Sequence, residues 1–190
     1  MQAFFSMLAE SFDLPILDWI QSNLQCGFLD FIMPIITLFG DAGIFWIACS
    51  VILLLIPKYR KVGLSMGFAL LLGLLVCNVT LKPLCQRIRP YDYQLQYFQR
   101  EIVLLIEAQH DFSFPSGHTI ASFEACTALM IRNKKLGIPA TILAIMIAFS
   151  RMYLYVHYPT DVIASVILGV AFGFIGCWLV DKLAQKFPKL

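Results

Sequence analysis

Five long apolar runs, separated by charged clusters, constrain this chain more than any other feature of its sequence. Only 14% of the residues are charged, against about 25% in an ordinary soluble domain, and 59% are hydrophobic. Such a chain has too few polar side chains to cover a soluble globule, and it is too apolar to be disordered. An integral membrane protein is the remaining class. The runs are Ala42–Pro57, Val62–Leu81, Thr119–Ile131, Leu136–Tyr155 and Val162–Val180.

The predicted fold is all-α, a polytopic membrane bundle with five spanning helices, because an open strand edge cannot be hydrogen-bonded in lipid. A span needs about 20 residues. The run from Thr119 has only 13 residues, so we expect its helix to extend back through Ser116 to His118. We expect one membrane-embedded domain over residues 1–190, with a catalytic helical core over 42–180 and a cytoplasmic tail over 181–190.

The first forty residues differ from the rest of the chain. Between Ile16 and Phe28, apolar residues recur at helical spacing and polar residues fill the other face. This pattern is typical of a helix lying in the membrane interface. The next apolar stretch is short and carries Asp30 and Pro34. We interpret residues 1–40 as interfacial or re-entrant helices, and a sixth span there is the alternative.

The basic residues predict the orientation. Nine of the fourteen Lys and Arg residues lie in three clusters, at 58–61, 132–135 and 182–189. Five spans place all three clusters on one side, which the positive-inside rule makes cytoplasmic. The outer side then receives the N-terminal segment, the loop 82–118 and the turn 157–161. We expect a multi-pass protein of the cell membrane, with its functional face outside.

Polar residues on this outer side have the chemistry of a phosphate site. Lys82, Arg89 and Arg151 offer three positive charges, and guanidinium groups match phosphate oxygens with two donors. Ser116 and Gly117 open a predicted helix, whose free N–H groups and dipole attract an anion. The net charge of +2 is too small to indicate a nucleic-acid partner.

Two histidines accompany these groups. His157 and Asp161 lie four residues apart across a turn, so the carboxylate can fix the tautomer of a nucleophilic imidazole. His118 belongs to the opposite cluster and can protonate a leaving oxygen.

We expect no metal, cofactor or disulfide. The six cysteines form no Cys-x-x-Cys pair, and most lie inside apolar runs. The outer acidic residues outside these clusters show no spacing typical of a Mg²⁺ or Ca²⁺ site; they are Asp92, Glu101, Glu107 and Asp111.

The three clusters together resemble the signature of the type-2 phosphatidic acid phosphatase family, whose fold is shared with vanadium haloperoxidases. Its three parts read here as Lys82 with Arg89-Pro90, then Pro115-Ser116-Gly117-His118, and finally Ser150-Arg151 with His157 and Asp161. Every signature position is filled and every spacing is kept. Longer members carry an additional N-terminal span, where this chain has the interfacial segment, so it is more similar to the compact bacterial members.

The resemblance implies a metal-independent lipid phosphatase. His157 would form a phosphohistidine intermediate supported by Asp161, while His118 would protonate the leaving group and then activate water. The other matched residues would hold the phosphate: Lys82, Arg89, Ser116, Gly117 and Arg151. The implied substrates are undecaprenyl diphosphate and phosphatidate or phosphatidylglycerophosphate. The signature does not separate these lipids, because its residues contact only the phosphate.

Four features lie outside the signature. We interpret Arg87 as a rim residue and His110 as a loop residue. Glu124 is a carboxyl in the middle of a predicted span, where such groups are functional candidates, although a hydrogen-bonded role between helices fits equally. Residues 95–106 predict a helix dipping into the surface, with an extended run over 101–107 as the alternative.

Two rival functions remain at this point. The same constellation would suit a vanadate-dependent haloperoxidase, but its soluble relatives lack so hydrophobic a chain. A lipid carrier or scramblase would need the cations, but it would not need a histidine with an orienting carboxylate. The sequence names neither the lipid nor the oligomeric state.

Overall fold

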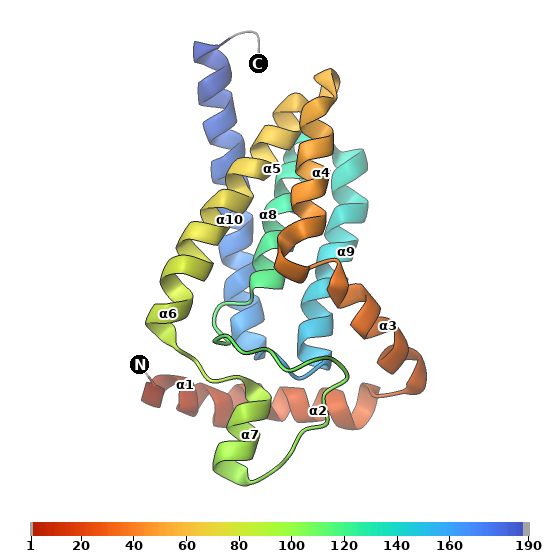
Figure 1. The fold of residues 1–190 in the computed structure, drawn as a ribbon, viewed down its shortest axis with the longest axis vertical. Helices are drawn as coiled ribbons and strands as arrows, with labels where there is room; N and C mark the ends of the chain where they lie inside the picture. Colours follow the sequence, from red (N-terminus) through yellow and green to blue (C-terminus); the bar gives the residue numbers. More distant parts are fainter. Residues whose placement is uncertain (1, 188–190) are drawn as a thin grey trace.

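The computed structural model describes residues 2–187, and this part of the chain contains helices and no strand. An upright bundle forms its main body (Figure 1). The helix that starts at Arg60 continues through a π-helical stretch, Leu74–Leu81, into α6 (Lys82–Cys85). The all-α prediction is thus confirmed. The bundle helices are α4 (Ile44–Leu55), α5 (Arg60–Gly73), α8 (Gly117–Arg132), α9 (Lys134–Tyr153) and α10 (Pro159–Lys186).

Helix α8 is the centre of the bundle and packs against α5, α9 and α10. It begins at Gly117 with Ser116 as its N-cap, as the short apolar run predicted. Its buried face carries small residues, including Ala125 and Ala128, which let the neighbouring helices approach closely. The start of α8 is thereby fixed at one end of the bundle.

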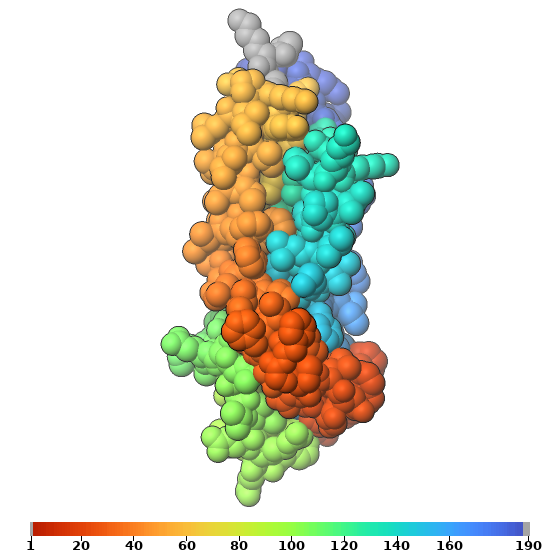
Figure 2. Space-filling view, turned by 90° about the vertical axis from the view of Figure 1, so that its right-hand side faces the viewer, coloured from red at the N-terminus to blue at the C-terminus, as the bar shows by residue number. Residues whose placement is uncertain are grey.

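The N-terminal segment crosses that end of the bundle. Helix α1 (Gln2–Leu8), a π-helical turn (Ala9–Asp13) and α2 (Leu14–Leu24) form one rod lying across the upright helices (Figure 1). Leu17 and Ile20 are buried against the bundle, whereas Phe12 and Trp19 are exposed. Helix α3 (Gly27–Leu38) then rises obliquely toward α4, and Figure 2 shows α2 and α3 below α4 and α9. The placement of this segment in the membrane interface stays a prediction.

Four helical stretches are long and apolar enough to cross a membrane: Gly27–Leu55, Pro57–Phe98, Lys134–Tyr153 and Pro159–Lys186. The first includes α3, which lies within the predicted interfacial segment. Helix α8, the predicted third span, has 16 residues and is shorter than these stretches. The chain is a multi-pass membrane protein by these features, and the number of five spans stays a prediction.

The two ends of the bundle differ in chemistry. The basic turns between α4 and α5 and between α8 and α9 lie at the same end of the bundle as the last turn of α10 (Figure 1). Helix α10 continues to Lys186, so most of the predicted tail 181–190 is helical, and residues 188–190 lie outside the described part. The opposite end carries Lys82, the loop 99–116 and the turn 154–158.

The outer loop is less helical than its spacing predicted. Helix α7 (Pro90–Phe98) ends where Gln99 takes a left-handed conformation with φ of 53°, and residues 99–116 contain no helix. The predicted helix over 95–106 is therefore wrong beyond Phe98, and residues 101–107, for which an extended run was the alternative, contain neither helix nor strand. His110 lies exposed in this loop, as predicted.

A prediction follows from the packing of α5 on α4. A Cβ added to Gly63 would lie 2.5 Å from the backbone nitrogen of Leu54 and 2.6 Å from the carbonyl oxygen of Ser50. Gly63→Ala should therefore force the two helices apart and cost roughly 1–3 kcal/mol. Thermal unfolding in detergent measures this loss. Gly27→Ala is the matched control, because a Cβ there meets nothing within 4 Å; equal stability of both variants would contradict the packing.

Candidate active site

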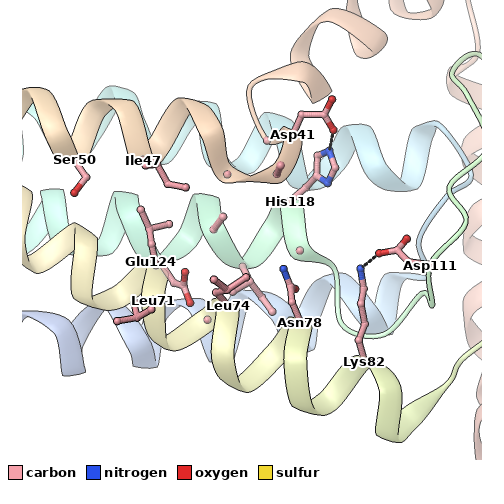
Figure 3. A pocket seen from close by; sticks show the side chains of 18 of the residues that line it. Asp41, Ile47, Ser50, Leu71, Leu74, Asn78, Lys82, Asp111, His118 and Glu124 are labelled. Atoms are coloured by element: carbon pink, nitrogen blue, oxygen red, sulfur yellow. Dashed lines mark hydrogen bonds and ion pairs between the residues drawn. The ribbon is translucent and has the colours of Figure 1, made fainter.

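A cavity of about 710 Å³ runs from the loop end of the bundle into its apolar middle. Its mouth is lined by signature residues from four parts of the chain: Lys82, Arg89, Gly117, His118 and His157. Its deeper part lies between α4 and α5, beside α8, and is lined mainly by aliphatic side chains (Figure 3). Its walls therefore combine a cationic end with an apolar groove.

His157 is buried, with 1% of its surface exposed, in the turn that precedes α10. An Nη1 donor of Arg89 lies 3.3 Å from its Nε2 atom. A guanidinium can only donate, so Nε2 is the acceptor and the ring proton lies on Nδ1. Nδ1 lies 3.5 Å from both Asp161 Oδ2 and Ser113 Oγ. The lone pair of Nε2 therefore faces the cationic groups.

The surroundings of His157 keep its imidazole neutral. Burial, followed by the positive charges of Arg89, Arg151 and Lys82, lowers the pKa of His157 well below its ordinary value. A neutral imidazole has a free lone pair, which a nucleophile requires. The same charges that would hold an anion thus also keep the histidine unprotonated before the anion arrives.

Lys82 and Arg89 share an anionic partner that the sequence analysis set aside. Both side chains donate to the carboxylate of Asp111, and Arg89 also donates to the Asp111 carbonyl at 2.8 Å. Burial alone would raise the pKa of Asp111, but the hydrogen bond from Lys82 and the nearby charges hold it well below its usual range. The two cations therefore already bind an oxyanion at the mouth of the cavity.

The remaining predicted phosphate ligands are Arg151, Gly117 and Ser116, and of these three only Gly117 lines the cavity. Arg151 is 1% exposed and donates to Thr37 Oγ1 at 2.6 Å, while its Nε and Nη2 atoms have no partner within residues 2–187. Gly117 lines the cavity as the first residue of α8. Ser116 lies behind it, and its backbone N–H is already used by Ser165 Oγ at 2.8 Å. Free donors thus come from Arg151 and the start of α8.

His118 faces the cavity from the first turn of α8. Its Nε2 atom lies 3.1 Å from Oδ1 of Asp41, in the turn between α3 and α4 (Figure 3). The sequence analysis did not single out Asp41, which is far from every signature position. The structure therefore places an aspartate near each of the two histidines, Asp41 at His118 and Asp161 at His157.

Arg87 is not the rim residue that we predicted. Its side chain is 2% exposed and donates to Asp161 Oδ1 at 2.5 Å and to Asp13 Oδ2 at 2.6 Å. Its guanidinium lies 3.8 Å from the ring centroid of Tyr158. The prediction was wrong because position 87 carries no signature residue, while its partner Asp13 is supplied by a helix 74 residues away.

Ser113 and Asp13 are the other polar residues that the sequence analysis missed. The Ser113 hydroxyl donates to Asp161 Oδ2 at 2.5 Å, and Asp13 Oδ1 accepts the backbone N–H of Thr160 at 2.9 Å. A lone serine in a loop and an aspartate in an amphipathic helix have no spacing that marks them. Their partners are known only once the chain is folded.

Comparison with known proteins places this geometry in a family. The model of the PAP2 superfamily matches residues 62–185. An undecaprenyl-diphosphatase of Sulfolobus acidocaldarius is 30% identical over 152 residues, which are 80% of this chain and 70% of the relative. A PAP2-type phosphatidylglycerolphosphate phosphatase of Bacillus subtilis superimposes with a TM-score of 0.67 at 25% identity, covering 97% of this chain and 94% of the other. Aquifex aeolicus LpxE has a TM-score of 0.69 at 22% identity, covering 87% and 94%, and so shares the fold.

The burial of Arg87 generates a prediction about stability. Arg87→Met should cost roughly 3–5 kcal/mol, because it leaves the carboxylates of Asp13 and Asp161 buried without a counter-charge. The matched control is Arg100→Met, which removes an ion pair to Asp18 that is 49% and 38% exposed and should cost less than about 1 kcal/mol. Unfolding midpoints in detergent compare the two variants. A similarly small loss of stability in both would contradict the role of Arg87 as a buried counter-charge.

Proposed function

The chain belongs to the PAP2 superfamily and is a membrane lipid phosphatase, and from this premise we propose that it hydrolyses a lipid phosphate or diphosphate through a phosphohistidine intermediate. The observation that carries the proposal is the pair of cations, Lys82 and Arg89, which hold the carboxylate of Asp111 while Arg89 also contacts Nε2 of His157. A phosphate that displaces Asp111 would bring its phosphorus to the lone pair of this nitrogen.

In the first step, His157 Nε2 would form a bond to phosphorus while the bond from phosphorus to the lipid oxygen breaks. His118 would give its proton to that oxygen, and the lipid alcohol, or the lipid monophosphate from a diphosphate, would leave. Asp161 and Ser113 would hold the Nδ1 side of the imidazolium that forms. Lys82, Arg89, Arg151 and the start of α8 would stabilise charge on the equatorial oxygens.

In the second step, water would attack phosphorus from the position that the leaving oxygen vacated. His118, now neutral, would take a proton from this water as the bond between phosphorus and Nε2 breaks. Inorganic phosphate would leave, and His157 would return to its neutral state. Over the two steps His118 gives up one proton and regains one, and His157 starts and ends neutral. The proposed reaction therefore needs no metal ion or other cofactor.

The apolar groove supports a substrate whose chain stays in the bilayer. Ile47 and Val51 of α4, Leu71 of α5 and Leu74 of the π-helical stretch after it line the apolar part of the cavity. This mouth lies at the end opposite the basic turns, so the positive-inside rule favours an extracytoplasmic site in the cell membrane. The relatives named above suggest undecaprenyl diphosphate or a phosphatidate or phosphatidylglycerophosphate lipid as the substrate.

The proposal predicts that the purified protein releases phosphate from lipid phosphates in detergent, and that EDTA does not reduce the rate. His157→Ala should lower kcat by at least about a thousandfold, because no other group replaces the nucleophile. His110→Ala is the matched control, since this histidine lies in the exposed loop and should retain the wild-type rate. Phosphate release by the His157 variant at the wild-type rate would overturn the mechanism.

A further inference from the structure

The carboxyl group of Glu124 lies in the groove without a partner. Its side chain is 1% exposed, and Oε1 has no hydrogen-bond partner within residues 2–187. Leu71 and Leu74 flank it (Figure 3), and no salt bridge in the described part of the chain involves it. An ionised carboxylate is strongly disfavoured in such surroundings, so Glu124 holds a proton and presents an O–H donor.

The fold makes room for this carboxyl. Gly73 of α5 faces it, and a Cβ at Gly73 would overlap Oε1. Glu124 lies seven residues after Gly117, which is about 10 Å along the helix axis, and helix side chains lean back toward the N-terminus. A lipid whose phosphate occupies the cationic mouth would therefore bring the linkage between its headgroup and its chains to this depth.

We propose that Glu124 is a binding site for an ester carbonyl of the lipid, and that the protein acts on phosphates of acyl-ester lipids of the glycerophospholipid class. The inference rests on the proposed function and narrows its substrate. An ester carbonyl accepts the O–H of Glu124, whereas a polyprenyl chain is hydrocarbon at that depth and leaves the buried donor unpaired. Unpaired buried donors reduce affinity, so this residue selects between the two lipid classes.

The test compares lipids that differ only at the linkage. Three substrates are assayed separately in detergent. They are a diacyl phosphatidate, its dialkyl ether analogue of equal chain length, and a polyprenyl phosphate. The wild type should favour the ester over the ether by about 3- to 10-fold in kcat/KM, the value of one hydrogen bond. Glu124→Leu should reduce this ratio to about one, whereas Glu124→Gln, which keeps an N–H donor, should retain most of it.

Gly73→Ala gives a second measurement, because its methyl group displaces the same carboxyl and should also reduce the ratio. An unchanged ratio in the active Glu124→Leu variant would overturn the proposal, as would a wild type that treats ester and ether alike. Failure of the proposed function looks different, since the wild type would then release phosphate from none of these lipids.

A separate observation concerns Asp41. The turn that carries it packs closely against His118, because a Cβ at Gly40 would lie only 2.7 Å from the imidazole Cδ2 atom. Ala42 and Gly43 take left-handed conformations, with φ of 46° and 68°, and the first of these is unusual for a residue with a side chain. The turn thereby brings the Asp41 carboxylate to 3.1 Å from His118 Nε2.

We infer that Asp41 is a positioning residue for the acid of the proposed reaction. Its carboxylate lies beside Nε2 of His118 as an ion-pair partner and would stabilise the imidazolium, while the other ring nitrogen would exchange a proton with the lipid oxygen or water. The other charged or titratable groups near His118 are Lys82, Arg89, Arg151, His157 and Asp111. All of them except Asp111 carry positive charge when ionised, and positive charge opposes the protonation of His118. Asp41 counteracts them.

The pH profile of kcat distinguishes this role from a structural one. Asp41→Asn removes the negative charge, so the limb of the profile governed by His118 should move to lower pH by about one unit, and Asp41→Glu should restore it. Asp92→Asn is the control, because it removes a charge from the exposed face of α7 at the same end. A uniform loss of rate at every pH in Asp41→Asn, or an equal shift in Asp92→Asn, would overturn the inference.

Discussion

The guanidinium of Arg87 joins three separate parts of the chain, and the geometry of the site depends on it. It bridges Asp13 of the N-terminal rod and Asp161 at the start of α10, and it stacks on Tyr158 next to His157. Two carboxylates buried together would repel each other, and the shared cation makes their burial possible. The N-terminal rod consequently helps to hold the turn that carries His157, although it contributes none of the signature residues.

The site concentrates charge at one end of an apolar bundle and keeps that charge compensated. Asp111 occupies the two cations Lys82 and Arg89, and Arg87 is neutralised by its two aspartates. Arg151 keeps two donors without a partner in the described chain, Nε and Nη2, beside Thr37. An incoming phosphate would exchange one oxyanion for another, so binding need not desolvate bare cations. The groove below it offers the hydrocarbon surface that a lipid chain needs.

Much of this arrangement was predictable from patterns in the chain. Apolar runs and charge clusters predicted the helices and the common end of the basic turns, and the short run after Thr119 correctly placed the start of α8 near Ser116. The signature predicted that Lys82, Arg89, His118 and His157 belong to one site, and all four line one cavity. The predictions failed where a residue acts through a distant partner: Arg87 was assigned to the rim, and Asp13, Asp41, Asp111 and Ser113 were not singled out. The helix predicted beyond Phe98 failed because loop packing overrode local spacing.

The sequence by itself determined the membrane class, the family and the residues predicted for the phosphate site, because these depend on composition and on short spacings along the chain. Only the tertiary structure decided which acidic groups contact them and where the apolar groove lies. Asp13 and Arg87 are 74 residues apart, as are Arg87 and Asp161, so no local period links them. Glu124 was recognisable as an unusual carboxyl, but its position in the groove follows from the approach of α5 at Gly73. Long-range packing creates such surroundings, and the surroundings of a titratable side chain determine its charge and its hydrogen-bond partners.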